Sequence, residues 1–245
     1  MVVAGWRLTV GYSRACADLI GGALRAVDAW KIRTSLPHGR KDLACAEGAI
    51  VGVDEAGRGA WAGPVVAAAV TVEPGCRGLE RGVVDSKLLS EKQREWVYEQ
   101  LVGCPEVRWK ARVVSHGRID EVNILQAALE AMGGAVLDLE GDGVVVGEVI
   151  VDGRHLPALP SRMPARAVVR GDQSSFVIAA ASILAKVVRD RHMRCLHRLY
   201  PAYGFGAHKG YGTQRHMAAL RAHGPADVHR MSFRPLKRLL QSTRG

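Results

Sequence analysis

Acidic residues stand at the ends of three apolar segments of strand length. They are Asp54 with Glu55 beside it, Asp152, and Asp172 after Gly171. In open α/β sheets the strand ends border a crevice in which ligands and reacting groups gather. A single acid at such a place is usually only a turn former. Three places, one of them a tandem pair, favour a cluster of carboxylates that does chemistry.

Clustered carboxylates would supply hard oxygen ligands for a metal ion. No Cys-x-x-Cys pair accompanies them in the sequence, so the set favours Mg²⁺ or Mn²⁺ over zinc. Two such ions about 4 Å apart clamp the attacking and leaving oxygens of an in-line phosphoryl displacement. The residue types and their placement therefore predict a nuclease or a polynucleotide transferase with a two-metal site.

The excess positive charge lies in the last quarter of the chain. Residues 186–245 carry thirteen Lys or Arg against two acids, whereas residues 1–185 carry twenty-one against twenty-two. This asymmetry favours a nucleic acid bound through the C-terminal segment over a merely solvated basic face. Charge alone separates neither DNA from RNA nor binding from catalysis. Six of the nine histidines follow Asp190, and we expect them at the surface or against the polyanion.

The composition is typical of a soluble protein with a packed core. Hydrophobic residues make up 48% of the chain and charged residues 24%, which excludes global disorder. No apolar run approaches the roughly 20 residues of a membrane helix, and Arg7, Arg14 and Asp18 interrupt any signal peptide. The five cysteines show no paired spacing, as in a reducing compartment. We therefore expect a cytoplasmic protein that does not bind membranes.

Alternating strands and helices must position the acids. The expected strands are 50–53, 64–72, 107–113, 144–151 and 167–169, and the expected helices are 90–101, 119–136 and 174–199. Ser90 and Gln93 form a capping box at the start of the first helix, and strand 64–72 is expected to pair back on strand 50–53. This order predicts an α/β fold with a mixed sheet and a basic helical end.

Five motifs are distributed over most of the chain. They are Ile50–Pro64 (IVGVDEAGRGAWAGP), Asp85–Ser90 (DSKLLS), Val151–Gly153 (VDG), Ala179–Lys186 (AAASILAK) and Tyr203–Thr213 (YGFGAHKGYGT). Together they resemble the motifs of the ribonuclease HII family, in the family's order, from about Ala49 to about Leu236. One departure is Ala60, where many relatives have proline.

The resemblance implies a ribonuclease H-like fold, in which helices flank a mixed central sheet and a basic helical segment ends the chain. It implies residues 1–48 as an N-terminal extension of unknown role. Within this extension, apolar residues at helical spacing indicate one amphipathic helix over 19–30. Residues 49–245 then form the catalytic domain, whose basic segment begins at about residue 190. The implied catalytic and metal-binding carboxylates, for Mg²⁺ or Mn²⁺, are Asp54, Glu55, Asp152 and Asp172. For Asp172 a helix cap is the alternative role.

The resemblance also implies residues that bind the substrate. The segment Gly57, Arg58, Gly59 corresponds to the one that senses the ribose 2′-hydroxyl at an RNA–DNA junction, and Tyr211 to the tyrosine that stacks beneath the following sugar. Glycines permit this close approach of the backbone, and only the 2′-hydroxyl distinguishes RNA from DNA at one nucleotide. Candidate phosphate contacts are Lys87, Lys186, Arg189 and Lys209. For Lys186, a core-helix position with only its amino group in solvent is the alternative.

The expected function is that of an endoribonuclease. It would cleave the RNA strand of RNA/DNA hybrids and nick 5′ to single ribonucleotides embedded in duplex DNA, leaving a 3′-hydroxyl and a 5′-phosphate. One alternative is a non-catalytic hybrid-binding module, which the intact carboxylates disfavour. Another is a different ribonuclease H-fold nuclease, such as a transposase or junction resolvase, which the segment 57–59 and Tyr211 disfavour. The sequence indicates no protein partner and no oligomeric state.

Overall fold

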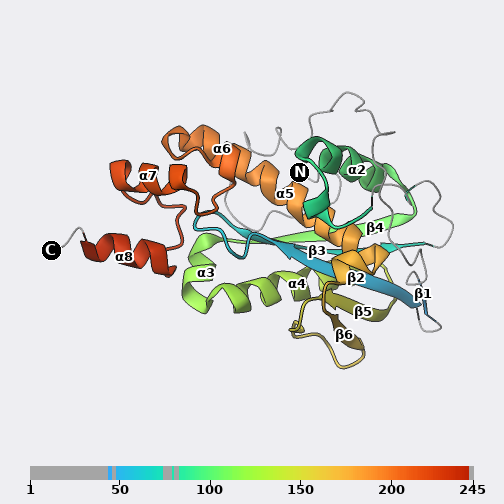
Figure 1. Cartoon of the computed structure of the whole chain (residues 1–245). Helices are drawn as coiled ribbons and strands as arrows, with labels where there is room; N and C mark the ends of the chain where they lie inside the picture. Colours follow the sequence, from blue (N-terminus) through green and yellow to red (C-terminus); the bar gives the residue numbers. More distant parts are fainter. Residues whose placement is uncertain (1–43, 46–47, 74–78, 80–82, 243–245) are drawn as a thin grey trace.

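The computed structural model of the chain describes residues 44–45, 48–73, 79 and 83–242. Figure 1 shows this part as a sheet with helices on both faces and a helical segment that extends from one end. The helix expected over residues 19–30 lies outside the described residues. The division of the chain at residue 48 stays a prediction.

A single mixed sheet forms the centre of the fold. Its strands are β1 (Ala44–Cys45), β2 (Gly48–Ala56), β3 (Val65–Val72), β4 (Val107–Val114), β5 (Val146–Asp152) and β6 (Ala165–Val168). The order is β4-β3-β2-β5-β6, with β1 paired to β2. Strands β2, β3 and β4 are antiparallel, whereas β5 runs parallel to β2 and β6 parallel to β5. The expected mixed sheet and the pairing of β3 with β2 are confirmed.

The parallel pairing of β2 and β5 positions the acids. Its register pairs Val53 with Val151, so Asp54 and Asp152 follow at neighbouring positions at the same edge of the sheet. Side chains alternate between the two faces of a strand. Each strand therefore packs one set of side chains against the helices on one face of the sheet and the other set against the helices on the opposite face.

Two long helices cover the two faces of the sheet. Helix α5 (Phe176–Leu199) packs on the face that carries Ile50, and α4 (Ile124–Gly141) packs on the face that carries Val51. Helix α2 (Glu91–Gly103) lies beside α5, with the predicted capping box at Ser90. A Cβ on Gly52 would lie 2.3 Å from the Val177 carbonyl carbon, so glycine is needed for α5 to lie this close to β2.

The helix expected over 119–136 is two helices. Helix α3 (His116–Val122) ends just before Asn123, and α4 begins just after it. Asn123 has a φ of 70°, which is not helical and changes the direction of the chain. The Asn123 side chain accepts hydrogen bonds from the N–H groups of Leu125 and Gln126 and so caps α4. The prediction of one helix is wrong because apolar spacing continues across the break, while asparagine tolerates a positive φ. Among the described residues no single helix is long and apolar enough to span a membrane, although α3 and α4, bent by 118°, reach that length and apolarity together.

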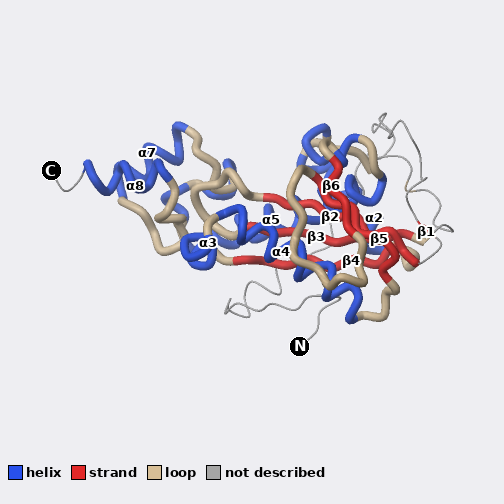
Figure 2. The backbone as a smooth tube through the Cα atoms, turned by 90° about the horizontal axis from the view of Figure 1, so that it is seen from below, coloured by secondary structure: helices blue, strands red, loops and turns tan. Residues whose placement is uncertain are grey.

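A small helical segment follows α5 at the C-terminal end. It contains α6 (Phe205–His208), α7 (Gln214–His223) and α8 (Arg234–Ser242). Its core consists of Leu196, Tyr203, Phe205, Leu220 and Leu236, with Ala62 and Trp61 from the loop after β2 packed against it. Figures 1 and 2 both place α7 and α8 at the end of the molecule away from β1 and β6. The loop after β2, the strand that carries Asp54, therefore also packs against the core of the C-terminal helical segment.

Candidate active site

Three carboxylates from different elements meet at the edge of the sheet. Asp54 comes from β2, Asp152 ends β5, and Asp172 lies in a 3-10 turn (Gly171–Gln173) before α5. One oxygen of each lies within 4.8 Å of the oxygens of the other two. The Gly171 N–H donates a hydrogen bond to Asp152 Oδ1 at 2.7 Å and fixes the turn against the end of β5. A hydrogen bond from the backbone therefore helps to hold the three carboxylates together.

Asp54 and Asp152 lie in an environment that opposes their ionisation. Burial raises the pKa of Asp54 well above its usual range, and the charges of Glu55 and Asp152 raise it further. Burial and the charge of Asp172 likewise raise the pKa of Asp152. Buried carboxylates this close together are costly unless a proton or a cation neutralises them. An all-oxygen donor set of this kind fits Mg²⁺ or Mn²⁺.

Glu55 lies beside this group but has a different partner. Its carboxylate accepts a hydrogen bond from Arg58 Nη1 at 3.2 Å. Burial raises the pKa of Glu55, while the charge of Arg58 lowers it. Of the four predicted carboxylates, the structure brings three together and holds the fourth against Arg58.

Lys87 places a cation next to the acids. Its Nζ lies 2.8 Å from Asp172 Oδ2 and 3.7 Å from Asp85 Oδ1. Asp85 also accepts a hydrogen bond from the Lys87 N–H and so begins the 3-10 turn Ser86–Leu88 that presents the lysine. Partial burial lowers the pKa of Lys87, but its hydrogen bond to Asp172 and the charges of the surrounding carboxylates together raise it more, and the net shift is upward. The Lys87 side chain is 75% exposed, so its ammonium group is accessible beside the site.

The loop after β2 brings glycine backbone against Tyr211. A Cβ on Gly59 would lie 3.7 Å from Tyr211 Cε1, and the Tyr211 side chain is partly exposed. Gly57 has a φ of 100°, and a Cβ there would overlap Arg189 Nε at 1.9 Å. The Ala60 N–H donates to the Gly57 carbonyl at 3.4 Å and closes a turn, a bond that proline could not make. The predicted ribose-sensing segment and the predicted stacking residue thus form one surface directly after Asp54 and Glu55.

Comparison with known proteins agrees with this geometry. A family model described as Ribonuclease HII matches residues 51–236. The chain belongs to the ribonuclease HII family. A Ribonuclease HII of Chlamydia abortus is 49% identical over 190 residues, which cover 78% of this chain and 86% of the relative. One of Nitrosococcus oceani is 48% identical over 193 residues, covering 79% and 92%.

The fold is shared with solved structures of the same kind. The crystal structure of the ribonuclease H2 from Pyrococcus horikoshii OT3 is similar with a TM-score of 0.63 at 25% identity, covering 80% of this chain and 98% of that one. The predicted ribonuclease H-like α/β fold is confirmed. The chain is accordingly a ribonuclease H, an endonuclease of the hydrolase class.

Two of the predicted phosphate contacts of this ribonuclease HII are buried. Arg189 is 0% exposed, and its guanidinium group donates to the carbonyls of Ala62, Pro64 and Lys209. Lys209 is 7% exposed, with its Nζ 3.4 Å from Glu91 Oε2. The prediction of a phosphate contact is wrong for Arg189 and unsupported for Lys209, because internal partners already take their donors. Counting charges along a sequence does not reveal such partners.

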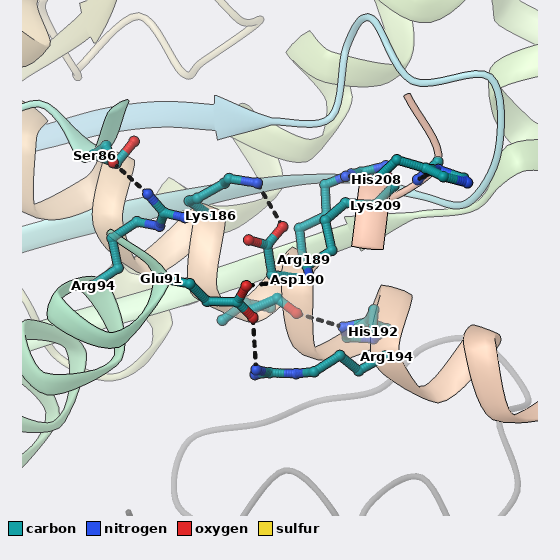
Figure 3. A network of polar contacts seen from close by, with 12 residues as sticks. Ser86, Glu91, Arg94, Lys186, Arg189, Asp190, His192, Arg194, His208 and Lys209 are labelled. Atoms are coloured by element: carbon teal, nitrogen blue, oxygen red, sulfur yellow. Dashed lines mark hydrogen bonds and ion pairs between the residues drawn. The ribbon is translucent and has the colours of Figure 1, made fainter. Parts of the chain in front are cut away.

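Lys186 is held by a carboxylate of its own helix. Its Nζ lies 2.6 Å from Asp190 Oδ1, one turn along α5 (Figure 3), and its side chain is 23% exposed. Burial lowers the pKa of Lys186, and the charge of Asp190 opposes this. The partly buried stem with a polar tip matches the alternative role stated for this residue, and a phosphate contact stays a prediction.

Sequence reasoning missed the residues that support Tyr211. His216 Nδ1 bonds to the Tyr211 carbonyl and His216 Nε2 to His229 Nε2, both at 3.0 Å. Both histidines are at most 1% exposed, so the expected surface position is wrong for them. Burial lowers the pKa of His216 to about 4. The one available signal was Thr213, which caps α7 and directs His216 inward at the third helical position.

Proposed function

We propose that this protein cleaves the RNA strand of RNA/DNA hybrids and nicks ribonucleotide-containing duplex DNA 5′ to a single embedded ribonucleotide. The products are a 3′-hydroxyl on the upstream fragment and a 5′-phosphate on the ribonucleotide. The observation that carries this proposal is the proximity of Tyr211 to Gly59, where a Cβ would lie 3.7 Å from Tyr211 Cε1, just beyond the strand that bears Asp54. Carboxylates that suit phosphodiester hydrolysis thus lie close to a surface that suits one ribose.

Three of the four predicted acids would be direct metal ligands, and the fourth lies beside them. Asp54, Asp152 and Asp172 would hold a divalent ion, since their oxygens are grouped within 4.8 Å, and Glu55 is the remaining carboxylate beside them. A bound pair of Mg²⁺ or Mn²⁺ ions would supply charge for the attacking and leaving oxygens and lower the pKa of a bound water. Lys87, exposed beside Asp172, adds a positive charge where a phosphate would lie.

Recognition of one ribose follows from Tyr211 and the loop after β2, here called the glycine loop, which contains Gly57, Arg58 and Gly59. Backbone groups of Gly57–Gly59 can approach a sugar closely because no side chain intervenes, and the 2′-hydroxyl both donates and accepts hydrogen bonds. The ring of Tyr211 supplies a flat apolar surface for the sugar that follows. A deoxyribose fits against such a surface more closely than a ribose, so cleavage at a junction is favoured.

The basic segment supplies contacts that are independent of base sequence. A hollow of about 560 Å³ is lined by Trp61, Met217, Arg221, Arg234, Pro235, Arg238 and Leu239. Among the described residues these three arginines have no carboxylate within ion-pair distance, which suits them to phosphates. Phosphate contacts of this kind position a duplex without reading its bases.

Cleavage of three matched duplexes tests the proposal. One carries a single ribonucleotide in DNA, one is all DNA, and one is a continuous RNA/DNA hybrid, each incubated with the protein and Mg²⁺. We expect a single nick 5′ to the ribonucleotide, cleavage of the hybrid, and an intact all-DNA duplex. Extension of the upstream product by a DNA polymerase would verify its 3′-hydroxyl. Binding without cleavage would favour a hybrid-binding module, and cleavage of the all-DNA duplex would favour a different nuclease of this fold.

A further inference from the structure

Two fully buried arginines lie beneath the glycine loop. Arg189 of α5 and Arg230, which precedes α8, are both 0% exposed. A buried guanidinium group is costly unless its five N–H donors are satisfied. The acceptors of these N–H donors indicate what the two side chains do.

All of their hydrogen bonds go to backbone carbonyls of two segments. Arg230 donates to Arg58 at 3.1 Å, to Gly63 at 2.9 Å and to Pro64 at 2.9 Å. Arg189 donates to Pro64 at 3.0 Å, to Ala62 at 3.3 Å and to Lys209 at 3.0 Å. The carbonyls of Arg58, Ala62, Gly63 and Pro64 all belong to the loop between β2 and β3, which contains the glycines. The carbonyl of Lys209 is two residues before Tyr211.

The two guanidinium groups therefore connect the two halves of the ribose-sensing surface. They share the Pro64 carbonyl, and through Arg189 the chain of contacts continues to Lys209. The Arg189 guanidinium carbon also lies 5.4 Å from the centroid of the Tyr211 ring, within the range of a cation–π contact. Gly57 lacks the Cβ that would collide with the same side chain. Loop and tyrosine are thus both fixed against Arg189.

Neither guanidinium group has an acidic partner among the described residues. Burial and the adjacent charge of Arg189 lower the pKa of Arg230 to about 9, so the Arg230 side chain remains cationic at neutral pH. Burial also lowers the pKa of Arg189. Arg191, on the same helix, shows the ordinary arrangement: its guanidinium group lies 2.7 Å from Glu95 and 2.8 Å from Glu99. Two adjacent buried guanidinium groups without an ion-pair partner reduce stability, which indicates a role in the site above them.

We propose that Arg189 and Arg230 are positioning residues that hold the Gly57–Gly59 loop against the Tyr211 segment and thereby set the selectivity of cleavage for a single ribonucleotide. This inference rests on the proposed function. Lysine keeps the charge but places one ammonium group where the guanidinium fork bonds three carbonyls. An Arg230→Lys variant therefore releases at least part of the loop without removing a group that touches substrate.

Cleavage of two substrates tests this proposal. Single-turnover rates are measured on the duplex with one ribonucleotide and on the continuous RNA/DNA hybrid, for the wild type, Arg230→Lys, Arg189→Lys and the control Arg191→Lys. The hybrid offers a 2′-hydroxyl at every position, so a loosened loop should harm it less. We expect the single-ribonucleotide rate to fall at least tenfold in Arg230→Lys and Arg189→Lys, with less than a threefold fall on the hybrid. Duplex Kd should change less than threefold, and Arg191→Lys should keep the wild-type ratio of rates.

The outcomes separate this inference from the proposed function. A wild type that ignores the single ribonucleotide contradicts the proposed function. A wild type that nicks it while both rates fall in parallel in Arg230→Lys and Arg189→Lys contradicts the positioning role. Loss of the far-UV circular dichroism of the fold in both variants also counts against it, because the arginines would then serve folding alone. A changed ratio in Arg191→Lys would assign the effect to general destabilisation of α5.

Discussion

Asp54→Asn should make the metal-free protein more stable while it abolishes cleavage. The substitution removes one charge from the buried group and keeps the side-chain volume. An asparagine oxygen can still accept the hydrogen bond that the Glu55 N–H donates to Asp54 at 2.6 Å. Sites that bind charge are commonly built at the cost of stability, so the gain in stability and the loss of activity have one cause.

The size of the gain follows from the distances. Two unit charges 4.8 Å apart, the upper separation in this group, repel by about 3 kcal/mol at an effective dielectric constant near 20. Asp54 takes part in two such pairs, but partial protonation at neutral pH reduces the repulsion. We therefore expect a net stabilisation of about 2 kcal/mol, which corresponds to a rise of about 4–8 °C in Tm for a chain of this size.

The dependence on pH has a definite sign. Because the pKa of Asp54 is raised in the folded state, the folded protein holds a proton that the unfolded chain has lost above its ordinary pKa near 3.9. The stability of the metal-free wild type should fall as pH rises from about 4 through the raised pKa. Asp54→Asn should show less of this fall.

Thermal unfolding in EDTA, with and without 10 mM Mg²⁺, measures both effects. If 10 mM is about ten times the Kd for Mg²⁺, binding adds about 1.4 kcal/mol and raises the Tm of the wild type by about 3–6 °C. The rise for Asp54→Asn should be smaller at any Kd. A matched control is Asp142→Asn, an acid at the far end of α4. An Asp54→Asn variant no more stable than the wild type in EDTA, or equal stabilisation of both by Mg²⁺, would show that the buried charges do not repel as described.

Three further predictions concern the surroundings of the acids. Tyr211→Ala should lower nicking at a single ribonucleotide more than cleavage within a continuous hybrid, since a stacking contact is worth roughly 1–3 kcal/mol; equal losses in a competition assay would oppose this role. His216, with a pKa of about 4 against an ordinary 6.5, should cost about 3 kcal/mol of stability as pH falls from 6.5 to 4. Urea unfolding of His216→Gln should show a smaller pH dependence, and an unchanged one would contradict the buried neutral histidine. Arg234→Glu with Arg238→Glu should reduce the slope of log Kd against log salt by about two, and an unchanged slope in a filter-binding titration would place the duplex elsewhere.

The sequence predicted the elements whose signal is local. The neighbouring positions of Asp54 and Asp152 were predictable because apolar runs of strand length stop there, and parallel neighbours bring such positions together. Strand β5 does end at Asp152, whereas β2 continues to Ala56. The capping box at Ser90 was predictable from two side chains. The break at Asn123 was not, because the apolar spacing continues across it and only the φ of one residue reveals the turn.

The partners of charged side chains were beyond the sequence. Arg189 and Lys87 have the same sign, yet one is buried under backbone carbonyls and the other is 75% exposed beside Asp172. Long-range contacts decide between these outcomes, and they join residues more than 80 positions apart. Glu55 likewise follows Asp54 directly but bonds to Arg58. Residue type predicted the chemistry of the site, while tertiary packing determined which side chains face it.

In the proposed function, one 2′-hydroxyl directs cleavage. Three duplexes that differ only in the substituent on one C2′ atom test this: a single nucleotide in otherwise identical DNA carries 2′-hydroxyl, 2′-hydrogen or 2′-fluorine. Single-turnover rates are measured with Mg²⁺ at saturating protein. We predict nicking 5′ to the nucleotide with the 2′-hydroxyl at a rate at least 100-fold above the other two. Cleavage of the 2′-hydrogen or 2′-fluorine duplex within tenfold of that rate would contradict it.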